Sequence, residues 1–239
     1  MRPTADGSFT LYSQRFQENC HSDAGAKEET LFHYLQGCQL EDLLQRQHEV
    51  VVLEIGFGTG LGARLTQEFF QAHKRSGQRL HFISTELDEN LITWAWPELR
   101  RTPDDMYCFE QDGFTLWVLA GDAREGLRTH HARLPRAHAI YQDAFSPKRS
   151  PGLWTQEFFQ LLGSLSAPDA RLATYSASVS IRKALHAAGW GVVKGPAFGR
   201  KKSSTRARWQ QDTPAELLAE LLQHPTPALT DAALPKDMP

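Results

Sequence analysis

The segment Val50–Gly60 constrains the fold of this chain more than any other stretch. It begins with an apolar, β-branched run, passes through Glu54, and continues with glycines at every second position, Gly56, Gly58 and Gly60. Such a run is typical of a strand buried on both faces, as in a parallel sheet. Glycines after it allow a sharp turn and a close approach of the backbone to a ligand. Because open α/β sheets bind ligands at this carboxyl edge, the segment predicts a site for a nucleoside-type cofactor.

Alternating strand and helix patterns follow along the chain and predict a doubly wound α/β sheet. After the glycines we expect helices at 61–74, 89–99, 155–165 and 181–188, and strands at 80–86, 114–119, 137–142, 171–176, 191–194 and 206–210. Before them, a short strand at 7–12 and helices at 28–36 and 40–46 form an N-terminal extension, residues 1–48. The main domain covers residues 49–212. Residues 213–239 are expected to hold one helix, 215–223, and a poorly ordered tail.

The composition describes a globular protein with one sizeable core, because 41% of the 239 residues are apolar and 23% are charged. The net charge of −2 excludes a uniformly basic nucleic-acid binder. Basic residues nevertheless gather at Lys148-Arg149 and Arg200–Lys202, which favours a local basic face.

The three cysteines, Cys20, Cys38 and Cys108, fit neither a disulfide framework nor a metal site. No apolar run approaches the roughly 20 residues that span a bilayer, and the N-terminus has no signal-peptide core. We therefore expect a cytoplasmic protein without a membrane partner. Since no long apolar stripe is left over, we also expect a monomer.

Two cofactors are compatible with the glycine run. Gly58–Ala63, followed by Glu86, fits a variant of the dinucleotide fingerprint. Glu54-x-Gly56-x-Gly58-x-Gly60 is the pattern typical of S-adenosylmethionine-dependent methyltransferases. S-adenosylmethionine carries a sulfonium and an α-amino acid instead of a pyrophosphate, so an acid before the glycines can bind its ammonium group directly or through water.

Acidic residues follow four successive strands and favour the methyl donor over the dinucleotide. Glu86 can accept hydrogen bonds from ribose hydroxyls, and Asp122 can accept one from an adenine amino group. Each acid taken singly is equally well explained as a solvated loop residue. The expected donor contacts are Glu54, Gly56, Phe57, Gly58, Thr59, Gly60, Glu86, Asp122 and Asp143.

The block Asp143–Thr155 carries a second set of chemical groups. Two prolines bracket a rigid loop, Asp143 lies at a strand end facing the expected donor, and aromatic and basic residues follow it. This combination suits a flipped-out base on a phosphate backbone. The alternative is a turn packed by its aromatic side chains, with solvated charges. The candidate substrate contacts here are Phe145, Pro147, Lys148, Arg149 and Trp154.

This block, together with Phe198-Gly199-Arg200-Lys201-Lys202 and the early stretch Asp6–Ser13, carries a family resemblance. From Asp6 to about Trp209 the chain resembles the methyltransferase domain of MnmC and its stand-alone relatives, MnmD, the tRNA 5-methylaminomethyl-2-thiouridine biosynthesis proteins. The resemblance implies a Rossmann-like class I methyltransferase with a mostly parallel sheet, an antiparallel last strand and a small N-terminal extension. Cys20-His21 stands where stand-alone members commonly have an aromatic residue before the histidine.

The resemblance also implies an activity. It predicts methylation of the exocyclic amine of 5-aminomethyl(-2-thio)uridine at the wobble position, in the anticodon region of tRNA, with Asp143 accepting a proton or orienting the amine. Arg200, Lys201 and Lys202 are expected to contact phosphates together with Lys148 and Arg149. The FAD-dependent oxidoreductase domain of two-domain members has no counterpart in this sequence, so no flavin chemistry is expected. A methyltransferase for another amine, a non-catalytic donor- or tRNA-binding module and a dinucleotide oxidoreductase remain alternatives.

Overall fold

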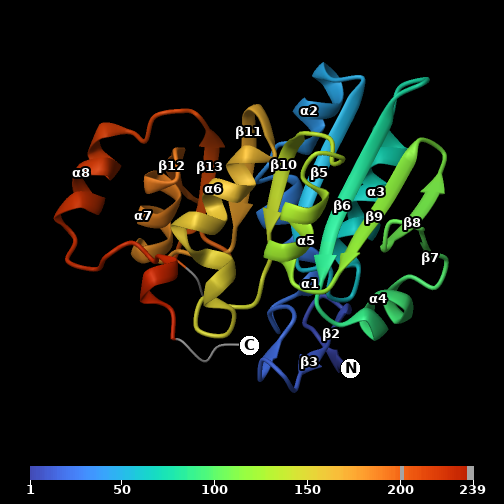
Figure 1. The fold of residues 1–239 in the computed structure, drawn as a ribbon, viewed down its shortest axis with the longest axis horizontal. Coiled ribbons are helices and arrows are strands. Elements are labelled where there is room, and N and C mark those ends of the chain that lie inside the picture. Colours follow the sequence, from blue (N-terminus) through green and yellow to red (C-terminus); the bar gives the residue numbers. More distant parts are fainter. Residues whose placement is uncertain (200–201, 236–239) are drawn as a thin grey trace.

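A nine-stranded sheet forms the centre of the molecule in the computed structural model, which describes residues 1–199 and 202–235 (Figure 1). The strand order is β12-β13-β11-β10-β5-β6-β9-β8-β7. Its five central strands are mutually parallel: β11 (Ser166–Thr174), β10 (Ala137–Gln142), β5 (Glu49–Ile55), β6 (Arg79–Glu86) and β9 (Phe114–Ala120). All five run toward one edge, where the sequence predicts the ligand.

Antiparallel strands complete both ends of the sheet. At one end, β13 (Ser204–Trp209) runs antiparallel to β11 and to β12 (Trp190–Gly195). At the other end, β8 (Met106–Gln111) pairs antiparallel with β9 and with the short β7 (Arg100–Arg101). The antiparallel last strand was predicted, whereas β7 and β8 were not. Strand β8 is a partly exposed strand with little apolar alternation, so its sequence carries a weak signal.

Helices cover both faces of the sheet, as the doubly wound fold predicts. Strand β5 shows this in its packing: Val50 and Val52 belong to one core cluster, and Val51, Leu53 and Ile55 belong to the other. The first layer contains α2 (Leu40–Arg46), α3 (Leu61–His73) and α4 (Glu89–Ala95). The second contains α5 (Ala123–His130), α6 (Gln156–Ser164), α7 (Val179–Ala187) and α8 (Ala215–Gln223).

Two helices differ from the sequence prediction. Helix α4 ends at Ala95 rather than at residue 99, because Trp96 precedes Pro97 and is thereby kept out of the helical region. Helix α5 was not predicted. Only Ala123 and Leu127 of α5 are buried, so its apolar periodicity is too sparse to stand out in the sequence.

The N-terminal extension consists of two small ribbons and a helical segment. Strands β1 (Arg2–Pro3) and β2 (Phe9–Thr10) form one ribbon, and β3 (Tyr12–Ser13) and β4 (Glu18–Asn19) form the other. Helix α1 (Ala26–Thr30) continues directly into a π-helical turn, η1 (Leu31–Leu35). The predicted helix at 28–36 is therefore α-helical in its first half and π-helical in its second.

The C-terminal segment after α8 packs onto the domain, in contrast to the poorly ordered tail that its composition predicts. Asp231, in the short 3-10 helix η3 (Asp231–Ala233), forms an ion pair with Arg124 of α5, with an Nη2–Oδ2 distance of 2.5 Å. The backbone N–H of Gln156 donates to the carbonyl of Leu229 over 2.8 Å. These contacts attach Leu229 and Asp231 to the domain, although the segment has few large apolar side chains.

No helix within residues 1–199 and 202–235 combines the length and the apolar character needed to cross a membrane.

Candidate functional site

A pocket of about 390 Å³ opens at the carboxyl edge of the parallel strands. The segments that follow β5, β6, β9 and β10 all contribute to its wall, and the N-terminal extension and the C-terminal segment complete it. Its lining residues are Arg15, Phe16, Cys20, His21, Gly56, Phe57, Gly58, Thr85, Glu86, Leu87, Gly121, Asp122, Ala123, Arg124, Asp143, Ala144, Phe145, Arg149, Ser150, Pro151, Gly152, Leu153 and Leu234. Volumes of this size suit a small-molecule ligand.

The glycine run forms the turn from β5 into α3, and part of it reaches the pocket. A Cβ atom at Gly56 would lie only 2.8 Å from the carbonyl oxygen of Asp143, so glycine permits the close approach of the two strand ends. Gly58 lines the pocket with φ +55°, and a Cβ atom there would meet no atom within 4 Å. Thr59 and Gly60 lie outside the pocket lining, and Gly60 is the N-cap of α3, which begins at Leu61.

Glu86 lies on the pocket wall at the end of β6. Its Oε2 accepts a hydrogen bond from the backbone N–H of Gly58 over 2.9 Å, and its Oε1 accepts one from Asp88 over 2.9 Å. Burial raises the pKa of the Glu86 carboxyl, while these backbone hydrogen bonds oppose the shift. Each oxygen keeps acceptor capacity for a further donor, such as a hydroxyl group.

Asp122 also reaches the pocket, where it has a structural task as well. Its Oδ1 accepts a hydrogen bond from the backbone N–H of Glu125 over 2.9 Å and thereby caps α5. The neighbouring Gly121 has φ +99°, and a Cβ atom there would meet nothing within 4 Å. The backbone between β9 and α5 therefore leaves open space on the pocket side.

Glu54 is the acid that the structure does not bring to the pocket wall. Its side chain is 1% exposed, and its Oε2 accepts a hydrogen bond from the Ser84 hydroxyl over 2.7 Å. Gly62 of α3 makes room for it, since a Cβ atom at Gly62 would lie 1.9 Å from Oε1 of Glu54. Burial raises the pKa of the Glu54 carboxyl well above its ordinary value, although the Ser84 hydrogen bond opposes this.

Replacing Glu54 with glutamine should stabilise the ligand-free protein by an amount that grows as the pH rises. In the unfolded chain Glu54 loses its proton above the ordinary carboxyl pKa of about 4.3, whereas buried Glu54 in the folded protein keeps it. The stability of the wild type therefore falls as the pH rises from this value to the raised pKa of the folded state. Glutamine keeps the Ser84 hydrogen bond and carries no charge. Urea unfolding of both proteins at about pH 5, 7 and 9 measures the difference. A difference that stays constant with pH would contradict this account.

Asp143 lies directly after β10, on the pocket wall. Its Oδ1 accepts a hydrogen bond of 2.5 Å from the hydroxyl of Tyr34, which belongs to η1. The hydroxyl of Tyr175 donates to the carbonyl of the adjacent Ala144 over 2.8 Å. These two hydrogen bonds fix the Asp143 carboxylate and the backbone next to it, so the carboxylate could orient a basic or nucleophilic nitrogen in the pocket.

The aromatic residues of the Asp143–Thr155 block have separate roles. The ring of Phe145 lines the pocket and stacks on Phe16, with centroids 4.4 Å apart and an interplanar angle of 25°. Trp154 is fully buried, and its Nε1 donates to the carbonyl of Phe145 over 2.8 Å. In this structure Trp154 supports the loop from the core, so the core-packing alternative describes it better than direct substrate contact.

The basic residues are spread along the pocket rim and beyond it. Arg149 lines the pocket, whereas Pro147 and the exposed Lys148 lie outside its lining. Lys202 is exposed in the connection between β12 and β13. Two of the predicted phosphate contacts, Arg200 and Lys201, lie outside the described residues.

The β3–β4 ribbon and the residues after it supply a wall that the site prediction missed. Glu18 of β4 accepts hydrogen bonds from the backbone N–H and the hydroxyl of Ser146, over 3.1 and 2.8 Å. Burial raises the pKa of Cys20 to about 12 and lowers that of His21 to about 4, so neither side chain carries a charge near neutral pH. The imidazole of His21 therefore adds no positive charge to a pocket that Glu86, Asp122 and Asp143 also line.

Comparison with known proteins agrees with this arrangement. A family model described as S-adenosyl-L-methionine-dependent methyltransferase matches residues 89–210, just over half of the chain. The chain is 32% identical over 219 residues to the tRNA 5-methylaminomethyl-2-thiouridine biosynthesis bifunctional protein MnmC of Azoarcus sp. (strain BH72), covering 84% of this chain and 34% of that protein. It is 33% identical over 228 residues to the Aromatoleum aromaticum protein of the same name, covering 86% of this chain and 34% of that one.

Among solved structures, MNMC2 from Aquifex aeolicus superimposes with a TM-score of 0.79 and 26% sequence identity, covering 95% of this chain and 77% of the other. The chain spans about one third of the length of the curated relatives that it matches. The dinucleotide alternative finds no support in these likenesses. This chain is MnmC-like and belongs to the family of S-adenosyl-L-methionine-dependent methyltransferases.

Proposed function

We propose that the pocket binds S-adenosylmethionine and that the chain methylates the exocyclic amine of 5-aminomethyl(-2-thio)uridine at the tRNA wobble position. The observation that carries this proposal is the position of Asp143. Its carboxylate lies on the wall of the pocket at the end of β10, next to the aromatic ring of Phe145. The relatives named above, whose names specify 5-methylaminomethyl-2-thiouridine biosynthesis, support the choice of substrate.

The chemistry of the pocket suits the donor. The empty spaces where Cβ atoms would stand at Gly58 and Gly121 form a cradle along two strand ends. Glu86 would accept hydrogen bonds from the ribose hydroxyls, and Asp122 would accept from the adenine amino group through the oxygen that does not cap α5. Three carboxylates, those of Glu86, Asp122 and Asp143, share the lining with three arginines, of which Arg124 is paired with Asp231. These carboxylates would face the positively charged groups of the donor.

Glu54 supports the donor from behind the glycine turn in this proposal. The buried carboxyl fills the space beneath Gly62 and connects β5 with Ser84 of β6. It thereby fixes the first turn of α3 relative to the strand ends. This role differs from the direct ammonium contact that the sequence pattern suggests.

When bound, S-adenosylmethionine supplies a methyl group on a sulfonium, and the acceptor nitrogen forms the new N–C bond as the C–S bond breaks and sulfur keeps the electron pair. The reaction needs no covalent intermediate with the chain, so the positioning of the acceptor nitrogen against the methyl group supplies most of the rate enhancement. The acceptor amine arrives largely as an ammonium ion and must release a proton first. Asp143 is placed to accept that proton or to orient the nitrogen lone pair.

The acceptor base is proposed to reach Asp143 beside Phe145. Phe16 covers one face of the Phe145 ring, so the base would stack on the outer face of one of these two rings. Arg149 on the pocket wall and the exposed Lys148 are then available for the backbone phosphates, together with Lys202, Arg200 and Lys201.

Replacing Lys148 and Arg149 together with alanine is expected to weaken tRNA binding and to reduce its salt dependence. Each phosphate contact contributes about 0.7 to 0.9 to the slope of log K against log salt concentration. Binding measured by filter retention over a range of salt concentrations gives this slope. An unchanged slope would show that both side chains are merely solvated. The control is the double replacement of Arg101 and Arg133 with alanine, because both arginines pair with surface acids and should leave the slope as it is.

A direct experiment separates the proposed function from its alternatives. The purified chain is incubated with S-adenosylmethionine that carries a labelled methyl group and with tRNA from cells that lack their own enzyme for this step. Label in tRNA supports the proposal, and label only in protein or small amines points to another acceptor. Donor binding without any transfer would indicate a non-catalytic module, and calorimetry with S-adenosylmethionine and NAD tests the cofactor itself.

A further inference from the structure

Tyr34 joins the N-terminal extension to Asp143. Its hydroxyl donates a 2.5 Å hydrogen bond to Oδ1 of Asp143, although the two residues are 109 positions apart in the chain. Its side chain is 2% exposed, and its ring stacks on Tyr141 of β10 with centroids 5.4 Å apart. The contact therefore lies in the packed interior, immediately behind the pocket wall.

The local backbone explains how Tyr34 reaches this position. It lies in the π-helical turn η1, and a π turn holds one residue more than an α turn, which changes the direction of the side chains that follow. Gly37 then allows close packing of this segment against β11. A Cβ atom at Gly37 would lie 1.8 Å from the carbonyl oxygen of His33 and 2.8 Å from Cβ of Ala173.

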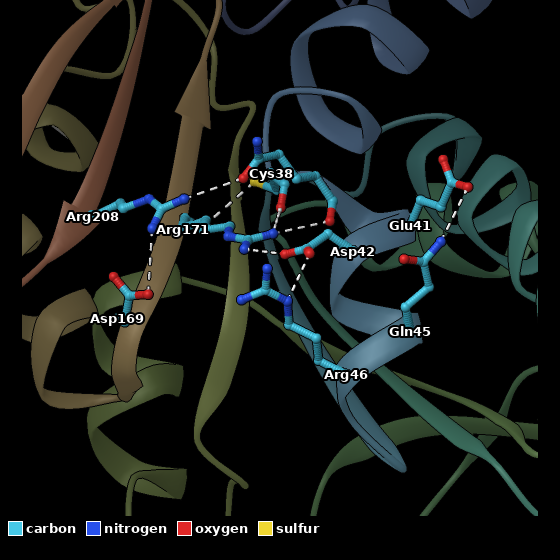
Figure 2. Close-up of polar contacts among 9 residues, drawn as sticks. Cys38, Glu41, Asp42, Gln45, Arg46, Asp169, Arg171 and Arg208 are labelled. Carbon is cyan, nitrogen blue, oxygen red and sulfur yellow. Dashed lines mark hydrogen bonds and ion pairs between the residues drawn. The ribbon is translucent and has the colours of Figure 1, made fainter.

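The segment after Tyr34 is fixed to the sheet by an arginine of β11 (Figure 2). Arg171 is buried, pairs with Asp42 of α2, and donates to the carbonyls of Cys38 and Gln39 over 3.3 and 3.1 Å. The thiol of Cys38 lies 3.4 Å from the carbonyl oxygen of Ile140, in the strand that leads to Asp143. The residues that follow Tyr34 are therefore held against β10 and β11.

We propose that Tyr34 is a positioning residue for methyl transfer, whose hydroxyl fixes the orientation of the Asp143 carboxylate and favours its ionised form. The inference rests on the proposed function of Asp143. A hydrogen bond donated to a carboxylate stabilises the charged form and leaves a defined set of lone pairs for the substrate. Burial and the neighbouring Asp143 raise the pKa of Tyr34 well above its ordinary value, so the hydroxyl keeps its proton and can donate.

Other ionisable groups surround Asp143, and Tyr34→Phe leaves each of them in the sequence. The groups on the elements around it are Arg15, Glu18, Cys20 and His21 of the ribbon, Glu29 and His33 of the helical segment, Glu54 and Glu86 of the central strands, Asp122 and Arg124 after β9, Arg149 of the pocket rim, and Tyr175 after β11.

The test compares Tyr34→Phe with Tyr141→Phe. Both residues are fully buried tyrosines, and their rings stack on each other, but the hydroxyl of Tyr141 lies 3.4 Å from the Thr66 hydroxyl instead of contacting Asp143. Each substitution removes one buried hydroxyl and keeps the ring. Tyr141→Phe therefore controls for any loss of activity that comes from the packing alone.

We expect Tyr34→Phe to lower kcat for methyl transfer by about tenfold to a hundredfold, the effect of one hydrogen bond to a charged group. The acidic limb of its pH–rate profile should move to higher pH by about one to two units. Tyr141→Phe should leave this limb in place. An unmoved limb in Tyr34→Phe, or an equal movement in both variants, would overturn the proposal.

A second readout keeps the inference independent of the substrate assignment. Carbon-13 labelling of the aspartate carboxyl groups, with Asp143 assigned from the signal lost in Asp143→Asn, gives the titration of this group in the ligand-free protein. The Asp143 signal should titrate at higher pH in Tyr34→Phe than in wild type and Tyr141→Phe. If wild type methylates no tRNA but this shift is present, the proposed substrate fails and the role of Tyr34 stands. If tRNA is methylated and the shift is absent, the role of Tyr34 fails alone.

Discussion

Asp143→Asn is expected to lower kcat for methyl transfer by about a hundredfold to ten-thousandfold, the usual range for a positioned proton acceptor. Asparagine has nearly the same shape, and its amide oxygen can still accept the hydrogen bond from Tyr34. Its amide nitrogen would then face the acceptor amine, where it can neither take a proton nor accept a hydrogen bond. Steady-state kinetics with tRNA measures the loss.

Two controls locate this effect in the reaction. Calorimetry should show that Asp143→Asn still binds S-adenosylmethionine, because Glu86 and the glycine turn form a different part of the pocket. Asp104→Asn changes an exposed carboxylate that pairs with Arg133, and it should leave kcat as it is. Normal turnover in Asp143→Asn would remove this residue from the proposed catalytic role, and lost donor binding would assign it to the donor instead.

Trp154→Ala should lower the free energy of unfolding by about 3 to 5 kcal/mol, the range for truncating a buried aromatic side chain. Trp154 is fully buried, and its ring packs edge-on against Tyr175 with centroids 5.8 Å apart. The substitution also removes the Nε1 donor from the carbonyl of Phe145. Urea unfolding measures the change in stability, and kinetics under conditions where the variant is folded measures the remaining activity.

Two further substitutions separate packing from substrate contact at Trp154. Trp154→Phe keeps most of the ring volume and loses the hydrogen bond, so we expect a smaller loss of about 1 kcal/mol. Trp94→Ala removes a tryptophan that is 50% exposed and should change stability by at most about 0.5 kcal/mol. A stable Trp154→Ala protein with a raised KM for tRNA would instead support the direct substrate contact that the sequence motif suggests.

The sequence predicts the part of the site that lies at the carboxyl edge of the parallel strands. Buried β5 and the glycine turn define that edge, and the acids after β6, β9 and β10 then follow from the parallel order of the strands. Glu54 does not line the pocket as those acids do, because the alternation of side chains along a strand decides which helical layer each of them faces. Glu54 shares one face of β5 with Val50 and Val52, so the same pattern places it under α3 and not on the pocket wall.

The remaining walls could not be predicted because they come from segments without a chemical motif of their own. Phe16 and His21 reach the pocket through the folding of the N-terminal ribbon, and Leu234 reaches it through the Arg124–Asp231 ion pair. Tyr34 depends on a π turn, which no local pattern in its sequence marks. The tertiary contacts that place these residues join positions more than 100 residues apart in two of these cases.

The central claim is that this chain methylates a wobble uridine amine, and nucleoside analysis of tRNA tests it most directly. tRNA that carries 5-aminomethyl(-2-thio)uridine is incubated with the chain and S-adenosylmethionine, digested to nucleosides and separated by chromatography with mass detection. The account predicts that 5-methylaminomethyl(-2-thio)uridine appears as 5-aminomethyl(-2-thio)uridine disappears, and that Asp143→Asn shows neither change. An unchanged wobble nucleoside in the presence of a wild-type protein that binds the donor would contradict it.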